Sequence, residues 1–150
     1  MTVQLGAPAP AADAFHLART SRRPFADVLA AVRAGIEAEG MKVLHEIDPQ
    51  AALHGFGHAI GGARLVFFFH PLLLLRLLEA DWTAIVDAPL KLALIELPGG
   101  AVHLRMARPD EALARYGNPA LARFGQELAA ACVRVLDAAA PAGSPGEPHA

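Results

Sequence analysis

Residues 65–78 constrain the fold more than any other stretch, because they are almost entirely apolar and are interrupted by one His-Pro pair. Residues 66–69 are bulky and predict a short strand. Pro71 favours a new start, and residues 72–79 predict a short helix that is apolar on nearly every side. Such a helix needs cover on more than one side. That cover comes from its own fold, from a partner subunit or from an apolar ligand.

The composition favours an assembled or ligand-bound protein. The 150 residues are 54% apolar and 19% charged, and they make one domain large enough for a real core. An apolar excess of this kind predicts a homodimer or a sheltered ligand. The net charge of −2 provides no electrostatic footprint for nucleic acid, so no nucleic-acid partner is expected.

The cysteine count and the hydropathy exclude several other classes of protein. Cys132 is the single cysteine, which excludes an intrachain disulfide and a multi-cysteine zinc site. It falls in the apolar stripe of a predicted helix, so we expect a packed, inert thiol. The run at 65–78 is shorter than the roughly 20 residues that span a bilayer, and residues 1–12 lack the pattern of a secretory signal. We therefore expect no membrane partner and a cytoplasmic location.

Alternation and turn signals predict the order of elements. Strands are expected near 14–20, 41–47, 66–69, 91–97 and 101–106, and helices near 24–39, 49–58, 72–79, 110–116 and 119–138. We predict an α+β fold, a single-domain sandwich of a mixed β-sheet with helices packed mainly on one face. The domain spans 14–139, after a loose segment at 1–13 and before a disordered tail at 140–150.

Three local details refine this prediction. Ser21 is the expected cap of the first helix. Alternation places Met41, Val43, His45 and Ile47 on one apolar face of their strand. It also places His16, His103 and Arg105 opposite their apolar neighbours, on a sheet face without helices.

Several short strings occur in an order and spacing typical of one family. They are Phe25-Ala26-Asp27-Val28-Leu29, Gly40-Met41-Lys42-Val43, Glu46-Ile47-Asp48, Phe68-Phe69-His70-Pro71, Asp87-Ala88-Pro89-Leu90-Lys91 and Asn118-Pro119. Over about 20–138 the chain resembles the family called domain of unknown function 302 (DUF302). The resemblance implies a compact α+β fold, commonly dimeric, and some members look like heme-binding proteins.

The chain departs from the family pattern in two places. His70 stands where the family has Asn before Pro71, and a leucine run replaces a polar, glycine-containing segment after it. If this segment contacts a ligand in relatives, the pocket here is more apolar and gains an imidazole.

Histidine is therefore the residue type to weigh, and the chain has seven. Histidine is a usual axial ligand of non-covalently held heme b, and the absence of a Cys-x-x-Cys-His string excludes covalent attachment. Our first candidate is His70, at a strand-to-helix junction. Phe67, Phe69 and Leu74 would form the apolar slot, and Arg64, Arg76 or Lys91 would meet the propionates. The alternative is a junction histidine whose ring bonds the backbone.

The remaining histidines give weaker metal-site candidates. His54 and His58 are spaced to share a helical face, but the glycines between them favour a loop. His45 is expected to be a core histidine or a buried ligand. His103 belongs to the open sheet face, where a dimer partner or a flat ligand could lie.

We thus predict a small dimeric ligand-binding protein that holds heme b, or a similar flat apolar small molecule, by histidine ligation. One alternative is a homodimeric interaction module without a cofactor. The other is a small enzyme that uses Asp48, Asp87 or Lys91 for acid–base chemistry.

Overall fold

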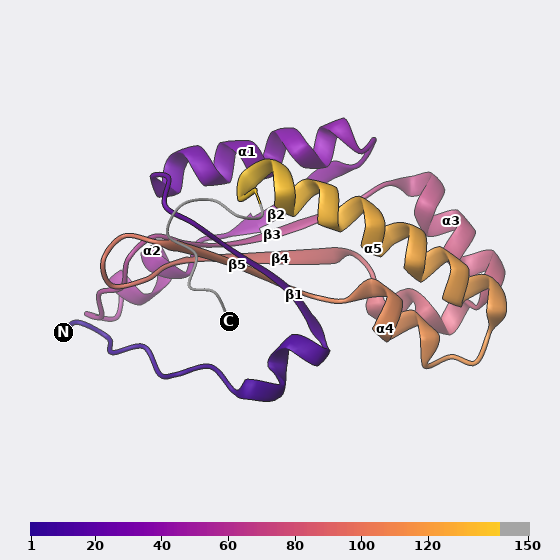
Figure 1. Ribbon diagram of the computed structural model, residues 1–150, viewed down its shortest axis with the longest axis horizontal. Helices are drawn as coiled ribbons and strands as arrows, with labels where there is room; N and C mark the ends of the chain where they lie inside the picture. Colours follow the sequence, from indigo (N-terminus) through magenta and orange to yellow (C-terminus); the bar gives the residue numbers. More distant parts are fainter. Residues whose placement is uncertain (142–150) are drawn as a thin grey trace.

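The computed structural model describes residues 1–141 and has five strands with helices packed against them (Figure 1). The strands are β1 (His16–Ser21), β2 (Lys42–Ile47), β3 (Ala63–Phe69), β4 (Leu90–Glu96) and β5 (Val102–Ala107). The α-helices are α1 (Phe25–Ala38), α2 (Pro49–His54), α3 (Pro71–Ala80), α4 (Pro109–Ala114) and α5 (Pro119–Ala139). Two 3-10 helices, η1 (Pro10–Ala14) and η2 (Trp82–Asp87), complete the described elements.

The sheet has the strand order β1-β5-β4-β3-β2, and every neighbouring pair of these strands is antiparallel. The predicted α+β class and element order are confirmed. The sheet is antiparallel rather than mixed, because β1 and β2, which run in the same direction, lie at opposite edges of the sheet and do not pair.

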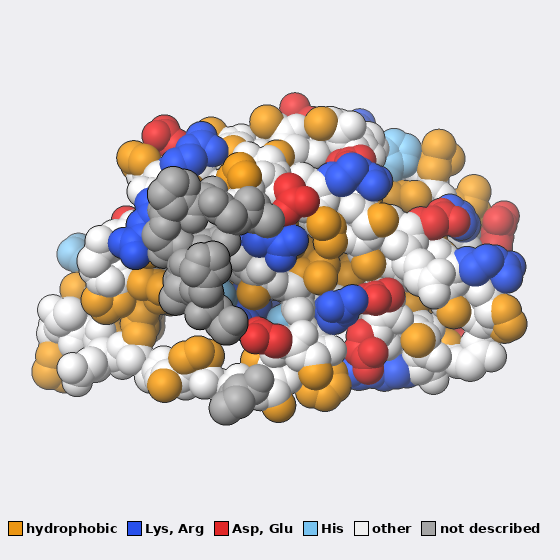
Figure 2. All heavy atoms as spheres, in the orientation of Figure 1, with side chains coloured by type: hydrophobic (Ala, Val, Ile, Leu, Met, Phe, Trp, Pro, Cys, Tyr) orange, Lys and Arg blue, Asp and Glu red, His pale blue; other side chains and the backbone are white. Residues whose placement is uncertain are grey.

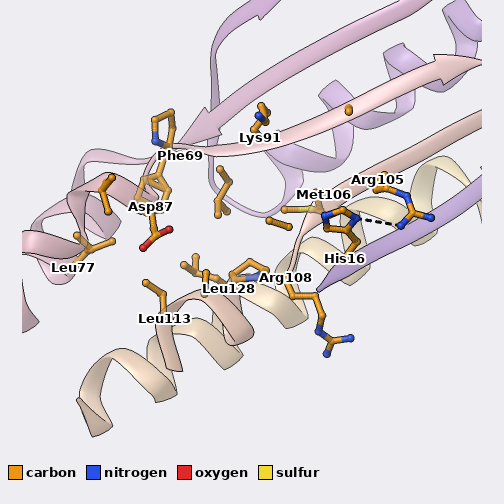
Figure 3. Close-up of a pocket in the computed structure, with 17 residues that line it drawn as sticks. His16, Phe69, Leu77, Asp87, Lys91, Arg105, Met106, Arg108, Leu113 and Leu128 are labelled. Atoms are coloured by element: carbon orange, nitrogen blue, oxygen red, sulfur yellow. Dashed lines mark hydrogen bonds between the residues drawn. The ribbon is translucent and has the colours of Figure 1, made fainter. Parts of the chain in front are cut away.

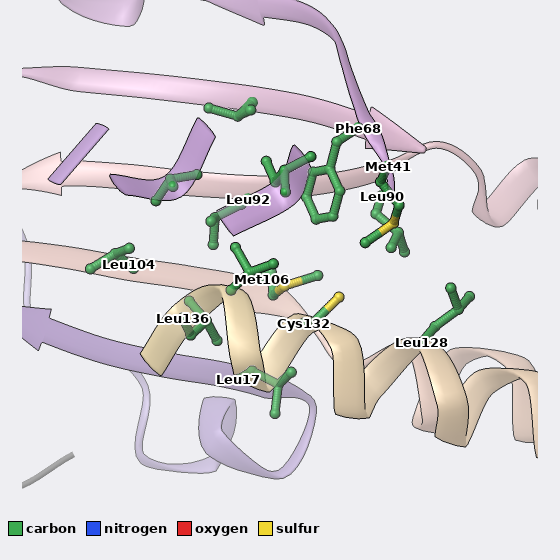
Figure 4. Close-up of a cluster of buried hydrophobic side chains, with 14 of the residues drawn as sticks. Leu17, Met41, Phe68, Leu90, Leu92, Leu104, Met106, Leu128, Cys132 and Leu136 are labelled. Carbon is green, nitrogen blue, oxygen red and sulfur yellow. The ribbon is translucent and has the colours of Figure 1, made fainter. Parts of the chain in front are cut away.

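Helices α1 and α5 cover one face of the sheet. The predicted apolar stripe of α5 is confirmed, since Leu121, Phe124, Leu128, Cys132, Val135 and Leu136 are all buried. Figure 4 shows Cys132 and Leu136 directed at Leu104 and Met106 of β5. Cys132 has no exposed surface, and burial raises the pKa of its thiol to about 12. The thiol is thus packed and kept protonated at neutral pH.

Local signals fix where the helices begin. The Asn118 side chain accepts hydrogen bonds from the N–H groups of Ala120 and Leu121, at 2.9 and 3.3 Å, which caps α5. The prediction that Ser21 caps α1 is wrong. Ser21 is buried at the end of β1, where its hydroxyl accepts from the Arg23 N–H, and α1 begins after Pro24 without a side-chain cap.

A β-bulge in β2 overturns the face assigned to His45. Val43 pairs with Phe68, but His45 pairs with Phe67, the next residue of β3. Because neighbouring residues of a strand point to opposite faces, the bulge moves His45 to the open face. His45 is exposed there, so it is not a core histidine.

The N-terminal segment differs from the expectation that residues 1–13 are loose. The segment expected to be loose is attached at its start, where Thr2 bridges Ala59 and the Val3 N–H donates to the Ala59 carbonyl at 2.9 Å. Most of the predicted tail, residues 142–150, lies outside the described residues.

Charged side chains of both signs are mixed over the face in Figure 2. No helix in residues 1–141 combines the length and apolarity needed to cross a bilayer.

Candidate functional site

A cavity opens where β4 and β5 stop pairing. Their register covers four residue pairs, from Ala93 opposite Arg105 to Glu96 opposite Val102. The other ends of the two strands continue past this register, to Leu90 in β4 and to Ala107 in β5. A cavity of about 490 Å³ lies between them (Figure 3). It connects the open sheet face with the helix layer.

The cavity has an apolar floor and a polar mouth. The floor includes three buried leucines, Leu77 of α3, Leu113 of α4 and Leu128 of α5. The polar and charged lining residues are His16, Asp87, Lys91, Arg105 and Arg108. In Figure 3, Asp87 lies at one end of the cavity, and His16 and Arg105 lie at the other.

Arg105 organises the polar end. Its guanidinium donates from Nε to Nε2 of His103 at 3.0 Å and from Nη1 to Nδ1 of His16 at 3.1 Å. A third bond runs from Nη2 to the Asp13 carboxylate at 3.3 Å. The predicted gathering of His16, His103 and Arg105 on the open face is therefore confirmed.

The donors of Arg105 select one tautomer of each neutral ring. A guanidinium only donates, so each neutral ring accepts with the nitrogen that faces Arg105 and carries its proton on the other. His103 then donates from Nδ1 to the Thr20 hydroxyl, at 3.2 Å. Burial lowers the pKa of His103, and the charge of Arg105 lowers it further. The neutral ring is the form that this network requires.

At the end of the cavity away from Arg105, a tyrosine hydroxyl is hydrogen-bonded to a carboxylate. The Tyr116 hydroxyl donates to the Asp87 carboxylate at 2.5 Å, and this bond is the main reason that the pKa of Tyr116 rises to about 12. Asp87 and Lys91 share this cavity, whereas Asp48 does not line it. Asp48 instead caps α2 by accepting from the Ala51 N–H, and it pairs with Arg64 at 3.4 Å. The three residues named for an enzyme do not form one site.

A second hollow of about 330 Å³ lies beside the first and contains His70. It is lined by Leu44, Phe69, His70, Pro71, Leu74, Ile85, Ala88 and Pro89. Phe69 and Pro89 line both hollows. His70 is the one polar side chain of this lining.

The His70 ring also caps α3. Its Nδ1 accepts a hydrogen bond from the Leu72 N–H at 3.0 Å. A neutral ring that accepts at Nδ1 carries its proton on Nε2. The backbone-bonded ring that we considered as an alternative is thus present in the structure.

The structure brings some of the predicted heme residues together and separates others. Phe69, His70 and Leu74 line the second hollow, and Phe67 pairs with Lys91 on the adjoining open face. Arg76 points away from this group, because it holds Glu127 with two bonds of 2.6 and 2.9 Å. Its guanidinium also lies 4.7 Å from the Phe124 ring centroid.

The other metal candidates are dispersed. α2 ends at His54, so His58 is not on the same helical face, although both line a shallow hollow with Asp48. The His45 ring lies 6.2 Å from the Phe67 ring. Within residues 1–141 no three His, Cys, Asp or Glu side chains are grouped to hold a metal ion.

Sequence reasoning missed two parts of these hollows. Ile85 lies in η2, a segment without periodic apolar spacing, and Leu44 is displaced by the bulge in β2. For the larger cavity, the available sequence signal was the Asp-Ala-Pro-Leu-Lys string, because its Asp87, Pro89 and Lys91 all line that cavity.

These observations define a class of protein, a small antiparallel α+β sandwich with cavities at one end of its sheet. A family model described as domain of unknown function DUF302 matches residues 17–139, and the chain belongs to this family. A crystal structure described as uncharacterized conserved protein DUF302 from Bacillus stearothermophilus is similar, with a TM-score of 0.76 and 17% identity. The match covers 83% of this chain and 98% of that one, and it shows the shared fold. The search of curated proteins found no match.

Proposed function

We propose that this protein is a small homodimeric binding protein that holds heme b, non-covalently and through histidine ligation, in the hollow that contains His70. The observation that carries the proposal is the lining of this hollow. It is apolar apart from one imidazole, as a protein-bound heme requires. Lys91 lines the larger cavity, which shares Phe69 and Pro89 with this hollow, and it is our candidate for a propionate.

The cap of α3 sets a condition on this function. Iron coordination through Nε2 of His70 takes up the lone pair at that nitrogen, so the ring proton moves to Nδ1. Nδ1 then no longer accepts from the Leu72 N–H. Heme ligation and helix capping therefore compete at one ring, and loss of the cap costs about 1 kcal/mol.

Titration with hemin tests the proposal. We expect a saturable Soret band at one heme per chain. His70→Asn is the sharpest variant, because the amide oxygen keeps a capping acceptor while the imidazole ligand is lost. We expect His70→Asn to shift or abolish the band without lowering the melting temperature.

Two results would contradict the proposal at different levels. An unchanged band in His70→Asn assigns the iron to another residue, and His45→Ala, His54→Ala, His58→Ala and His103→Ala then locate it. A wild type that gives no saturable spectrum removes heme from the function and leaves the interaction module.

The dimer in this proposal is supported by exposed apolar side chains beside the His70 hollow. Leu72, Leu75, Trp82 and Val86 are exposed by 68, 51, 72 and 79%. Apolar side chains that gather at one end of a protein often mark an interface. Light scattering at micromolar concentration is expected to give twice the chain mass.

A matched pair of variants tests this surface. We expect Leu75→Glu to give the monomer mass, because it places a charge on α3. Phe56→Glu changes an 85% exposed side chain near α2, at the other end of the sheet, and is expected to remain a dimer (Figure 1). A monomeric wild type contradicts this part of the proposal.

A further inference from the structure

The larger cavity has the properties of a binding site that does not depend on His70 or on iron. Its volume of about 490 Å³ lies within the range of small-molecule sites. Its floor of Leu77, Leu113 and Leu128 comes from three different helices, α3, α4 and α5, which together support it. An apolar group placed there would be removed from water, which is favourable.

The mouth of this cavity carries unmatched positive charge. Arg108 is neutralised by Asp110 through bonds of 3.2 and 3.0 Å. Arg105 meets one carboxylate, that of Asp13, which is 79% exposed and 3.3 Å away. Lys91 pairs with no carboxylate in residues 1–141, and its strand position points it to the same open face as Arg105. The mouth therefore presents Lys91 and a weakly paired Arg105.

His16 adds a neutral donor at the same place. Its Nδ1 accepts from Arg105, so the proton of the neutral ring is on Nε2. This N–H has no acceptor among the described residues. A guanidinium and an imidazole N–H thus stand at one end of an apolar cavity. The Lys91 ammonium belongs to the same lining, two residues along β4 from Ala93, the partner of Arg105, and all three groups are donors.

Asp87 gives the cavity a direction. It lies at the end away from His16 and Arg105 (Figure 3), and its carboxylate is held by Tyr116. A negative charge at that end repels an anion, whereas the opposite end attracts one. A ligand with one acidic group therefore binds in one orientation.

We propose that this cavity binds an organic carboxylate with an apolar body. The carboxylate lies at Lys91, Arg105 and His16, and the apolar body extends over Leu113 toward Leu77. Charge-assisted bonds from guanidinium and ammonium groups are among the stronger hydrogen bonds of proteins, which supports recognition of the acid rather than of the apolar body alone.

Calorimetry with decanoate, and with decan-1-ol as its uncharged counterpart, tests this site. We expect one decanoate per chain and binding of decan-1-ol weaker by about 10-fold or more. Lys91→Gln is expected to weaken decanoate by about 10-fold, since it removes one charged donor. The chain has one other lysine, Lys42, which is exposed in the edge strand β2 and does not line the cavity. Lys42→Gln is the matched control and is expected to leave the affinity unchanged.

Three outcomes overturn the inference. They are no saturable binding of decanoate, equal affinities for decanoate and decan-1-ol, and equal effects of Lys91→Gln and Lys42→Gln. Because the probe contains no iron, its result is separate from the hemin titration. Decanoate binding without a heme spectrum supports this site and removes the heme proposal. A heme spectrum without decanoate binding supports the heme proposal and removes this site.

Discussion

The two faces of the sheet are built from alternate residues of the same strands, yet they differ in almost every physical property. Phe68 points to the helix side and has no exposed surface, while its neighbour Phe67 is half-buried on the open side. The helix side is a closed apolar layer. The open side carries imidazoles, Arg105 and Lys91, and the larger cavity opens onto it. One face holds the fold together and leaves the other available for binding.

Truncating one phenylalanine on each face tests this difference most strongly. Phe68→Ala removes a fully buried ring and leaves a void, so we expect a loss of about 3–5 kcal/mol in the free energy of unfolding. Phe67→Ala removes a ring that already meets water, and we expect about 1–2 kcal/mol. Urea denaturation of both variants provides the measurement. Equal losses would mean that the open face is covered in solution.

A smaller effect is expected where the helix side supports the cavity. Gly125 of α5 lies against α4, and a Cβ there would come within 2.9 Å of the Pro109 carbonyl oxygen and 3.1 Å of the Leu113 Cβ. We expect Gly125→Ala to cost about 1–3 kcal/mol by overpacking, despite the better helix propensity of alanine. Leu113 lines the cavity, so the variant is also expected to weaken decanoate.

Ala130→Gly measures helix propensity alone, because Ala130 is an exposed position of α5. We expect a loss of about 1 kcal/mol. If Gly125→Ala instead stabilises the protein by a similar amount, the close contact between α4 and α5 is not rigid.

Periodicity predicted the helix side well, because burial imposes a regular pattern on the sequence. The stripe from Leu121 to Leu136 and the alternation around Leu104 both follow from residue spacing. The cap at Asn118 was also predictable, since Asn followed by Pro both accepts at the helix start and fixes its first turn. The same alternation placed His16 and Arg105 on the open face.

The site was less predictable, because it depends on interruptions of regular structure. The bulge in β2 and the early end of the β4–β5 register are set by packing between distant segments, and neither has a local signal. His70 was found from its junction with Pro71. The ring that bonds the backbone was one of two alternatives at this junction, and residue spacing alone does not decide between a helix cap and a ligand.

The smallest effect expected is a pH dependence from the open face. The pKa of His103 is lowered by burial and then by Arg105, while Asp13 acts in the opposite direction. The unfolded chain therefore binds a proton at a higher pH than the folded chain does. The contribution of His103 to the free energy of unfolding is complete above the usual histidine pKa of about 6.5, and it is lost as the pH falls through the pKa of the folded state.

Urea denaturation between pH 7 and pH 5 isolates this contribution when the wild type is compared with His103→Gln. The glutamine amide still accepts from Arg105, but it does not titrate. We expect the free energy of unfolding to fall more for the wild type than for His103→Gln over this range. The difference between the two is expected to be smaller than the loss caused by Phe68→Ala. Parallel curves would mean that the ring is solvated in both states, and the open face would then be wetter than the Arg105 network implies.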